Sequence, residues 1–321
     1  MILPPPREAT AAARAALEGM WKGSKERYLR LFLRGEPVRG LREEFQPLVD
    51  CGIARRDWLG RTRACARVFP FFGRFIATDL LSHDAPDQVF SLMFEQVYLM
   101  RNSTIRDGDD VLELCSGSGA NCICAADLAR SVTGTDISPR ALAFSAFNAA
   151  LNPPRRPPEF RAGSLFEPLP RGATFDAILF NPPFEIAPGS EPFFLHSHGG
   201  EDGLDVIRAA LREAPRRLRP GGRFEIVTFS PGSDDDPHLL GLLEEAFPDA
   251  RIEVHLLDEE PVAHYTRRFR DDAWVARLGE QGITRIYFLY VRILTGAGRG
   301  RRMHSPHDEI ARCRAIAAEW E

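Results

Sequence analysis

The sequence predicts an α/β fold with a mostly parallel sheet, preceded by a small unit of helices and a β-hairpin. From residue 110 onward, short apolar runs alternate with stretches of helical period, which is typical of parallel strands joined by crossover helices. A glycine turn, Gly117-Ser-Gly119, directly follows the first of these runs, and Asp136 ends the second. In open α/β sheets, ligands bind where such turns meet, at the carboxyl ends of the strands.

For residues 1–86 the sequence predicts a separate small domain. Residues 8–34 have apolar positions near helical spacing, and Gly35-Glu36-Pro37 ends that helix. We expect a second short helix at 41–51 and a β-hairpin that turns at Pro70–Gly73. This order resembles a winged-helix unit, which can bind DNA, bind protein or cap an enzyme.

Residues 87–295 predict the α/β domain, which begins with a helix at 87–101. The strand candidates are 110–115, 131–136, 159–162, 175–180, 223–228, 251–256 and 284–293. The helix candidates are 120–129, 139–148, 204–218 and 236–246. For residues 296–321 the sequence predicts a flexible basic linker at 296–302, followed by a last helix. That helix could dock on the domain, mediate assembly or have no role.

Composition narrows the function classes. The 321 residues are 44% hydrophobic, with 41 basic against 45 acidic residues and a net charge of −4. This balance makes a nucleic acid an unexpected partner. No run approaches the roughly 20 apolar residues of a membrane span, and the first residues lack a signal-peptide pattern, so we expect a cytoplasmic protein. The six cysteines form no Cys-x-x-Cys pair, which predicts reduced thiols and no metal site.

The glycine turn and the acid suit a ligand that carries a ribose. Gly117 and Gly119 let the backbone approach a ligand closely, and the following helix directs free N–H groups toward it. Asp136 is placed to hold ribose hydroxyls. The third glycine of a dinucleotide-binding loop is replaced by Cys122, which argues against NAD as the first choice.

The fourth strand candidate ends in Asn181-Pro182-Pro183-Phe184. Proline cannot donate to a sheet ladder, and it holds the preceding residue extended. The motif therefore predicts a rigid segment at the end of a strand, which we call the lip (Asn181–Phe184). Beyond it, Glu185 is an open candidate for a substrate contact, whereas His196 and His198 are expected to be solvated loop residues.

Four stretches together resemble a class I S-adenosylmethionine (SAM) methyltransferase: VLELCSGSG, TGTDIS, GSLFEP and FDAILFNPPF. The last one, with GGEDGLD at 199–205, is most similar to the HemK/PrmC-type glutamine methyltransferases and their small-domain relatives. The resemblance covers about 40% of the chain. It implies a Rossmann-like sheet of seven strands, mostly parallel, with an antiparallel last strand.

The resemblance also implies roles at matching positions. Gly117 and Gly119 would pass under the methionine part of SAM, Asp136 would hold the ribose, and Ile137 would lie against the adenine. Relatives usually carry Asp where this chain has Ser164, so the adenine contact there departs from the family pattern. The implied cofactor-binding set is Glu113, Cys115, Gly117, Gly119, Asp136, Ile137, Ser164, Leu165 and Asn181.

The lip would bind the methyl acceptor, with Asn181, Pro182 and Phe184 as the catalytic set. The Asn181 side-chain oxygen and the Pro182 carbonyl can accept hydrogen bonds from a planar NH₂ group, and Phe184 can stack on it. Rate enhancement would come mainly from positioning the nitrogen.

The resulting prediction is a SAM-dependent methyltransferase that acts on an amide- or amine-type nitrogen. The acceptor would be a protein glutamine or a small biosynthetic metabolite. Two alternatives remain open at this point: a SAM-consuming cyclisation that releases methylthioadenosine, and a SAM-binding regulator without activity. Oligomeric state is not indicated by the sequence.

Overall fold

The computed structural model describes residues 7–39, 43, 46–189, 194–234, 236–269 and 271–320. The chain begins with α1 (Arg7–Gly23), α2 (Lys25–Tyr28) and a π-helical turn at Leu29–Leu33, so the predicted single helix is interrupted at Ser24. Of the predicted second helix, α3 (Gln46–Asp50) lies within the described residues.

Two antiparallel hairpins follow these helices. The first, β1 (Ala54–Arg56) with β2 (Thr62–Ala64), was not predicted. The second, β3 (Arg67–Phe71) with β4 (Arg74–Thr78), confirms the predicted turn. Its two central residues, Phe72 and Gly73, both have positive φ (44° and 74°), as a tight type I′ hairpin turn requires.

The main sheet has nine strands, eight of which form a continuous path, while β10 (Asp236–Pro237) pairs only with β9. Along that path the strands are β13 (Gly300–His304), β11 (Arg251–Pro261), β12 (Arg285–Leu294), β9 (Leu218–Ser233), β8 (Phe175–Phe180), β5 (Asp110–Leu114), β6 (Ser131–Asp136) and β7 (Glu159–Ala162). Strands β7, β6, β5, β8 and β9 are parallel neighbours, and β12 is antiparallel to both β9 and β11. The predicted Rossmann-like sheet is thus present, and the strand predicted to be antiparallel is β12. The predicted seven strands become nine, because β10 and β13 were not predicted.

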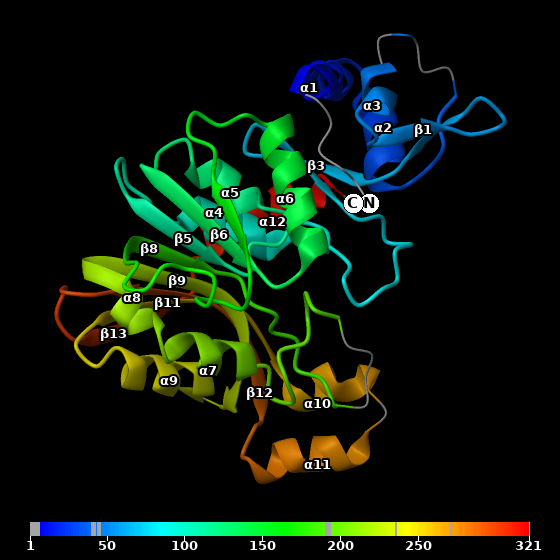
Figure 1. The fold of residues 1–321 in the computed structure, drawn as a ribbon. Helices are drawn as coiled ribbons and strands as arrows, with labels where there is room; N and C mark the ends of the chain where they lie inside the picture. Colours follow the sequence, from blue (N-terminus) through cyan, green and yellow to red (C-terminus); the bar gives the residue numbers. More distant parts are fainter. Residues whose placement is uncertain are drawn as a thin grey trace.

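Helices cover both faces of this sheet (Figure 1). One face carries α4 (Phe94–Asn102), α5 (Ala120–Ala125), α6 (Pro139–Leu151) and α12 (His307–Ala318). The other face carries α7 (Asp205–Leu211), α8 (Ala214–Arg217) and α9 (His238–Ala246). Strand β8 alternates accordingly: Ala177 and Leu179 belong to one apolar cluster, and Ile178 and Phe180 belong to the other. The described residues include no helix with the length and hydropathy needed to cross a membrane.

Two regions differ from the expectation. The segment predicted as a flexible basic linker contributes β13, which pairs in parallel with β11 at the sheet edge. Its five residues are all exposed and lack a strand-like apolar pattern. Backbone pairing with β11, an ion pair between Arg301 and Glu244 and a ring contact between His304 and His255 hold them in place. Between β11 and β12 lie α10 (Val262–Tyr265), a 3₁₀ turn (Thr266–Arg268) and α11 (Asp272–Glu280), none of which was predicted.

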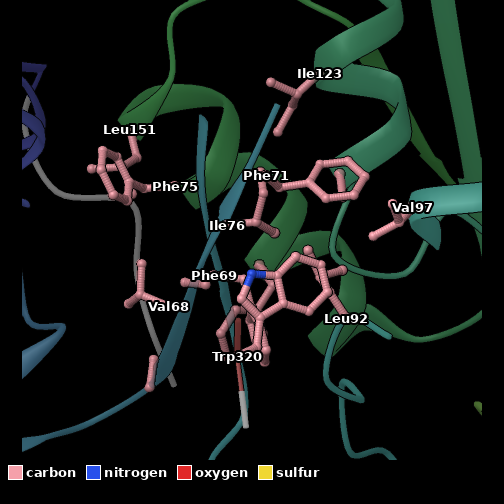
Figure 2. Packing of buried hydrophobic residues seen from close by; sticks show 14 of the residues in the cluster. Val68, Phe69, Phe71, Phe75, Ile76, Leu92, Val97, Ile123, Leu151 and Trp320 are labelled. Carbon is pink, nitrogen blue, oxygen red and sulfur yellow. The ribbon is translucent and has the colours of Figure 1, made fainter. Parts of the chain in front are cut away.

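One hydrophobic core joins the N-terminal hairpin, the sheet and the C-terminal helix. Figure 2 shows Phe69, Phe71 and Ile76 of the hairpin packed beside Ile123 of α5 and Trp320 from the end of the chain. The ring centroid of Trp320 lies 5.3 Å from that of Phe69 in an edge-to-face contact. The C-terminal segment therefore docks on the N-terminal hairpin.

Candidate functional site

The predicted site residues meet at the carboxyl edge of the sheet. Leu114, the last residue of β5, pairs with Thr135 of β6 on one side and with Phe180 of β8 on the other. The glycine turn, the acid at the end of β6 and the lip after β8 therefore begin side by side. Strand order reverses between β5 and β8, so the lip lies at a topological switch point, where α/β sheets bind ligands.

Side chains of α6 donate hydrogen bonds to the backbone carbonyl groups of the glycine turn. The Ser145 hydroxyl donates to the Gly117 carbonyl at 2.8 Å, and the Asn148 amide donates to the Ser118 carbonyl at 2.9 Å. Gly117 has a φ of 53°, and a Cβ there would meet nothing within 4 Å, so space is open above the turn. A Cβ at Gly119 would lie 2.9 Å from the Phe160 ring, so this glycine is required by packing.

Cys115 occupies the first position of this turn and has a φ of 56°, a region that favours glycine. Desolvation by burial raises the pKa of its thiol, so the side chain remains neutral. A non-glycine residue in this conformation costs of the order of 1 kcal/mol.

Glu113 points into the protein beneath the turn and is 2% exposed. One carboxylate oxygen accepts from the Asn121 side chain at 2.8 Å, and the other accepts from the Cys122 backbone N–H at 3.0 Å. Burial raises its pKa to about 7, although these hydrogen bonds oppose the shift. Glu113 therefore anchors the start of α5, and its predicted place in the cofactor site becomes one of positioning the turn.

Asp136 bridges the glycine turn and the start of α6. Its carboxylate accepts from the Gly117 N–H and from the Ser138 N–H, both at 2.8 Å. Desolvation raises its pKa, and the backbone donors oppose that rise. Each oxygen keeps a second lone pair that a ligand hydroxyl can use.

The residues predicted to flank an adenine border the same edge. Ile137 follows Asp136 and is 59% exposed, which leaves an apolar side chain uncovered beside the acid. Leu165 has a φ of 48°, and the Ser164 N–H donates to Glu167 at 3.3 Å. The strained turn at Leu165 was not apparent from the sequence, because no glycine marks it.

The lip carries a buried acceptor atom that has no partner among the described residues, the Asn181 side-chain oxygen. Pro182 and Pro183 have no N–H, so the lip itself cannot satisfy that atom. This oxygen is therefore able to accept a hydrogen bond from a bound group.

Phe184 belongs to an aromatic group that closes one side of the lip. Its ring centroid is 4.9 Å from that of Phe229 on β9 and 6.2 Å from that of Phe288 on β12. The ring is half-buried. It can therefore offer only its remaining surface to a ligand.

The glycine-rich stretch after the lip supports it from behind. A Cβ at Gly199 would lie 2.9 Å from the Phe184 Cα, and one at Gly203 would lie 2.9 Å from the Phe184 carbonyl oxygen. The segment is thus glycine-rich because it touches the lip backbone directly. Asp202 accepts from the Leu204 N–H at 3.1 Å, which is a structural role at the start of α7.

Two neighbours of the lip have more defined contacts than the sequence indicated. Glu185 forms an ion pair with Arg268 at 2.9 Å, so its charge is already matched. His196 stacks on Phe90 with centroids 4.6 Å apart, and its Nε2 is buried without a partner in the described ranges. Desolvation lowers the pKa of His196. The expectation that His196 is a solvated loop residue is therefore wrong.

These features fit SAM. The open space over Gly117, the spare acceptors of Asp136 and the uncovered Ile137 match a methionine chain, a ribose and an adenine, respectively. The buried Asn181 oxygen follows β8, the strand that neighbours β5 in the sheet.

Comparisons with known proteins agree with this geometry. The family model "Methyltransferase small domain" matches residues 78–251. A release factor glutamine methyltransferase from Koribacter versatilis is 31% identical over 61% of this chain and 72% of its own length.

Two further relatives match a shorter part of the chain. A ribosomal protein uL3 glutamine methyltransferase from Bradyrhizobium diazoefficiens is 37% identical over 43% of this chain and 44% of its own length. A release factor glutamine methyltransferase from Cereibacter sphaeroides is 38% identical over 42% and 51%, respectively. The chain thus spans about half the length of these two relatives.

Among solved structures, a 16S rRNA N2 G1207 methyltransferase from T. thermophilus, in complex with AdoMet and guanosine, superposes with a TM-score of 0.43 at 19% identity. The superposition covers 74% of this chain and 56% of that one. The family model spans more than half of the 321 residues, and the site it covers has the features of a SAM site. The chain therefore belongs to the methyltransferase small domain family and is a SAM-dependent methyltransferase.

Proposed function

We propose that this enzyme methylates the side-chain amide nitrogen of a protein glutamine, and that it does so in the cytoplasm. The orphaned Asn181 oxygen carries the proposal, because it is a fixed, buried acceptor that calls for an N–H donor. A glutamine amide has two N–H groups, one for Asn181 and one for the Pro182 carbonyl. The names of the relatives from Koribacter, Bradyrhizobium and Cereibacter support the same acceptor.

The chain's own residues would supply binding and orientation. Bound SAM provides an electrophilic methyl group on a positively charged sulfur. Asn181 and Pro182 would hold the acceptor nitrogen in line with it, and the ring of Phe184 would limit rotation of the planar amide. Positioning of this kind is the main source of rate enhancement for a weak, delocalised nucleophile.

A small metabolite that carries an amide or amine is the second candidate. The Leu195 N–H donates to the Pro86 carbonyl at 2.9 Å, and His196 stacks on Phe90. These contacts join the loop beyond the lip to the segment before α4. Contacts that restrict access to the lip would favour a small acceptor over a protein chain.

Mass spectrometry distinguishes these candidates. The enzyme is incubated with SAM and either glutamine-containing proteins and peptides or a pool of amine and amide metabolites. S-adenosylhomocysteine together with one added methyl group on a glutamine residue is the expected result. Methylation of a metabolite alone would transfer the proposal to the second candidate, and release of methylthioadenosine would overturn both.

A further inference from the structure

The N-terminal unit has a charge opposite to that of the rest of the chain. Residues 24–67 contain 11 Lys and Arg against six Asp and Glu, whereas the remainder contains 30 against 39. The chain therefore contains a basic segment even though its net charge is −4. A local excess of this size provides a surface for a polyanion.

Much of this charge lines a groove of about 730 Å³ between α2 with the π-helical turn that follows it, residues 37–39, and Arg61 just before β2. Its basic side chains are Lys25, Arg27, Arg30, Arg39 and Arg61. Among the described residues, Arg27 and Arg39 have no acidic side chain within ion-pair distance. Both guanidinium groups are therefore available to an anion.

The β1–β2 hairpin, which we call the basic wing (Ala54–Ala64), extends this charge away from the body of the protein (Figure 1). Arg55 and Arg63 are cross-strand neighbours on it. Asp57 orders the turn, since it accepts from the Arg61 side chain at 2.8 Å and from the Leu59 N–H at 3.0 Å. The wing is thus a structured element.

An aromatic side chain stands at the tip of the wing. Trp58 is 88% exposed, and the adjacent Leu59 is 47% exposed. A flat indole ring beside several guanidinium groups can stack on an unpaired base while the arginines contact the neighbouring phosphates. An acidic protein surface would match the charge but would not require the ring.

We propose that the basic wing and its groove bind a single-stranded nucleic-acid segment, with phosphates on Arg27, Arg39 and Arg55 and a base stacked on Trp58. The sequence argued against a nucleic acid only through the charge of the whole chain, and that average hides this surface. The proposal concerns the N-terminal unit and is independent of the methyl acceptor.

Fluorescence anisotropy of the full chain with labelled single-stranded RNA, single-stranded DNA and duplex RNA tests the proposal. We expect single-stranded oligonucleotides to bind more tightly than duplex, with affinity that falls steeply as salt rises. Trp58→Ala should weaken binding about tenfold. The double substitution Arg39→Glu with Arg55→Glu should reduce the slope of log Kd against log salt by about 2. The RNA and DNA arms identify the natural ligand class.

Arg301→Glu with Arg302→Glu is the matched control, because these exposed arginines lie on β13, away from the N-terminal unit in Figure 1. The control pair should leave oligonucleotide binding unchanged, and none of the variants should change methyl transfer to a short glutamine-containing peptide. Equal losses in the wing and control variants would overturn the proposal. So would binding of polyglutamate as tight as that of RNA and insensitive to Trp58→Ala, which would indicate an acidic protein partner.

Discussion

At the scale of single residues, Asn181 is the side chain on which the proposed chemistry depends. Its oxygen is buried and has no hydrogen-bond partner within the described ranges. Removing the side chain therefore breaks no hydrogen bond of that oxygen when the acceptor is absent. We expect Asn181→Ala to bind SAM within about twofold of the unmodified enzyme and to lose roughly 10²–10³-fold in kcat.

Calorimetry for SAM binding and a product assay for turnover measure the two effects separately. Asn102→Ala is a matched control, because the Asn102 side chain donates only to the Tyr98 carbonyl in its own helix. If Asn181→Ala retained full turnover, its assigned role would be wrong.

Glu113 should make stability depend on pH. Burial raises its folded pKa to about 7 from 4.5, so its neutral form is favoured in the folded protein. This contribution is complete below about pH 4.5 and is lost as pH rises through 7, with an upper bound of roughly 3 kcal/mol. Glu113→Gln should therefore show a flatter decline of Tm between pH 5 and 8 than the unmodified protein.

Differential scanning calorimetry at several pH values measures this difference. The exposed Glu245, replaced by Gln, is the control and should leave the curve unchanged. Parallel curves for the Glu113→Gln variant and the unmodified protein would contradict the prediction.

At the scale of elements, α6 connects the N-terminal hairpin to the glycine turn. Asn148 accepts from the Ala77 N–H at 2.8 Å and donates to the Ala77 carbonyl at 2.9 Å. Asn152 makes the same pair of bonds with Phe75, at 2.9 and 2.8 Å. The two amides thus pair with the edge of β4 as a neighbouring strand would, and only Asn148 also reaches the Ser118 carbonyl.

This geometry predicts different effects for two similar substitutions. Asn148→Ala and Asn152→Ala should each destabilise the fold by roughly 2–3 kcal/mol, because each leaves buried backbone groups unpaired. Only Asn148→Ala should also weaken SAM binding several-fold, since it frees the glycine turn. Chemical denaturation and calorimetry measure the two quantities, and equal SAM affinities in the two variants would contradict the coupling.

At the scale of the whole molecule, the N-terminal hairpin and the C-terminal helix share one hydrophobic core with the sheet. Trp320 is 5% exposed and packs on Phe69 and Phe71. We expect Trp320→Ala to lower the free energy of unfolding by about 3–5 kcal/mol. Trp58→Ala, at an 88% exposed position, should change it by less than about 0.5 kcal/mol.

Urea unfolding followed by circular dichroism provides this comparison. Because the hairpin, sheet and C-terminal helix share a core, the unmodified chain should unfold in a single transition. Similar losses for the two tryptophan variants would show that the C-terminal docking contributes little.

Much of the fold could be predicted from the sequence where local pattern and tertiary role agree. The strands before the glycine turn, Asp136 and the lip are buried apolar runs bounded by turn residues, and their predicted limits match β5, β6 and β8 within one residue. By contrast, β13 has no apolar pattern to detect. The helices α10 and α11 lie within what the sequence presents as a polar loop.

The parallel sheet, the glycine turn, the acid at Asp136 and the lip at Asn181 are apparent in the sequence, because each depends on local backbone chemistry. Three features are apparent only in the folded chain: Glu113 turns inward, Arg268 neutralises Glu185, and Trp320 packs on the N-terminal hairpin. The tertiary structure also decided where the basic charge gathers. Those outcomes depend on which distant residues become neighbours, and that is set by packing of the whole chain.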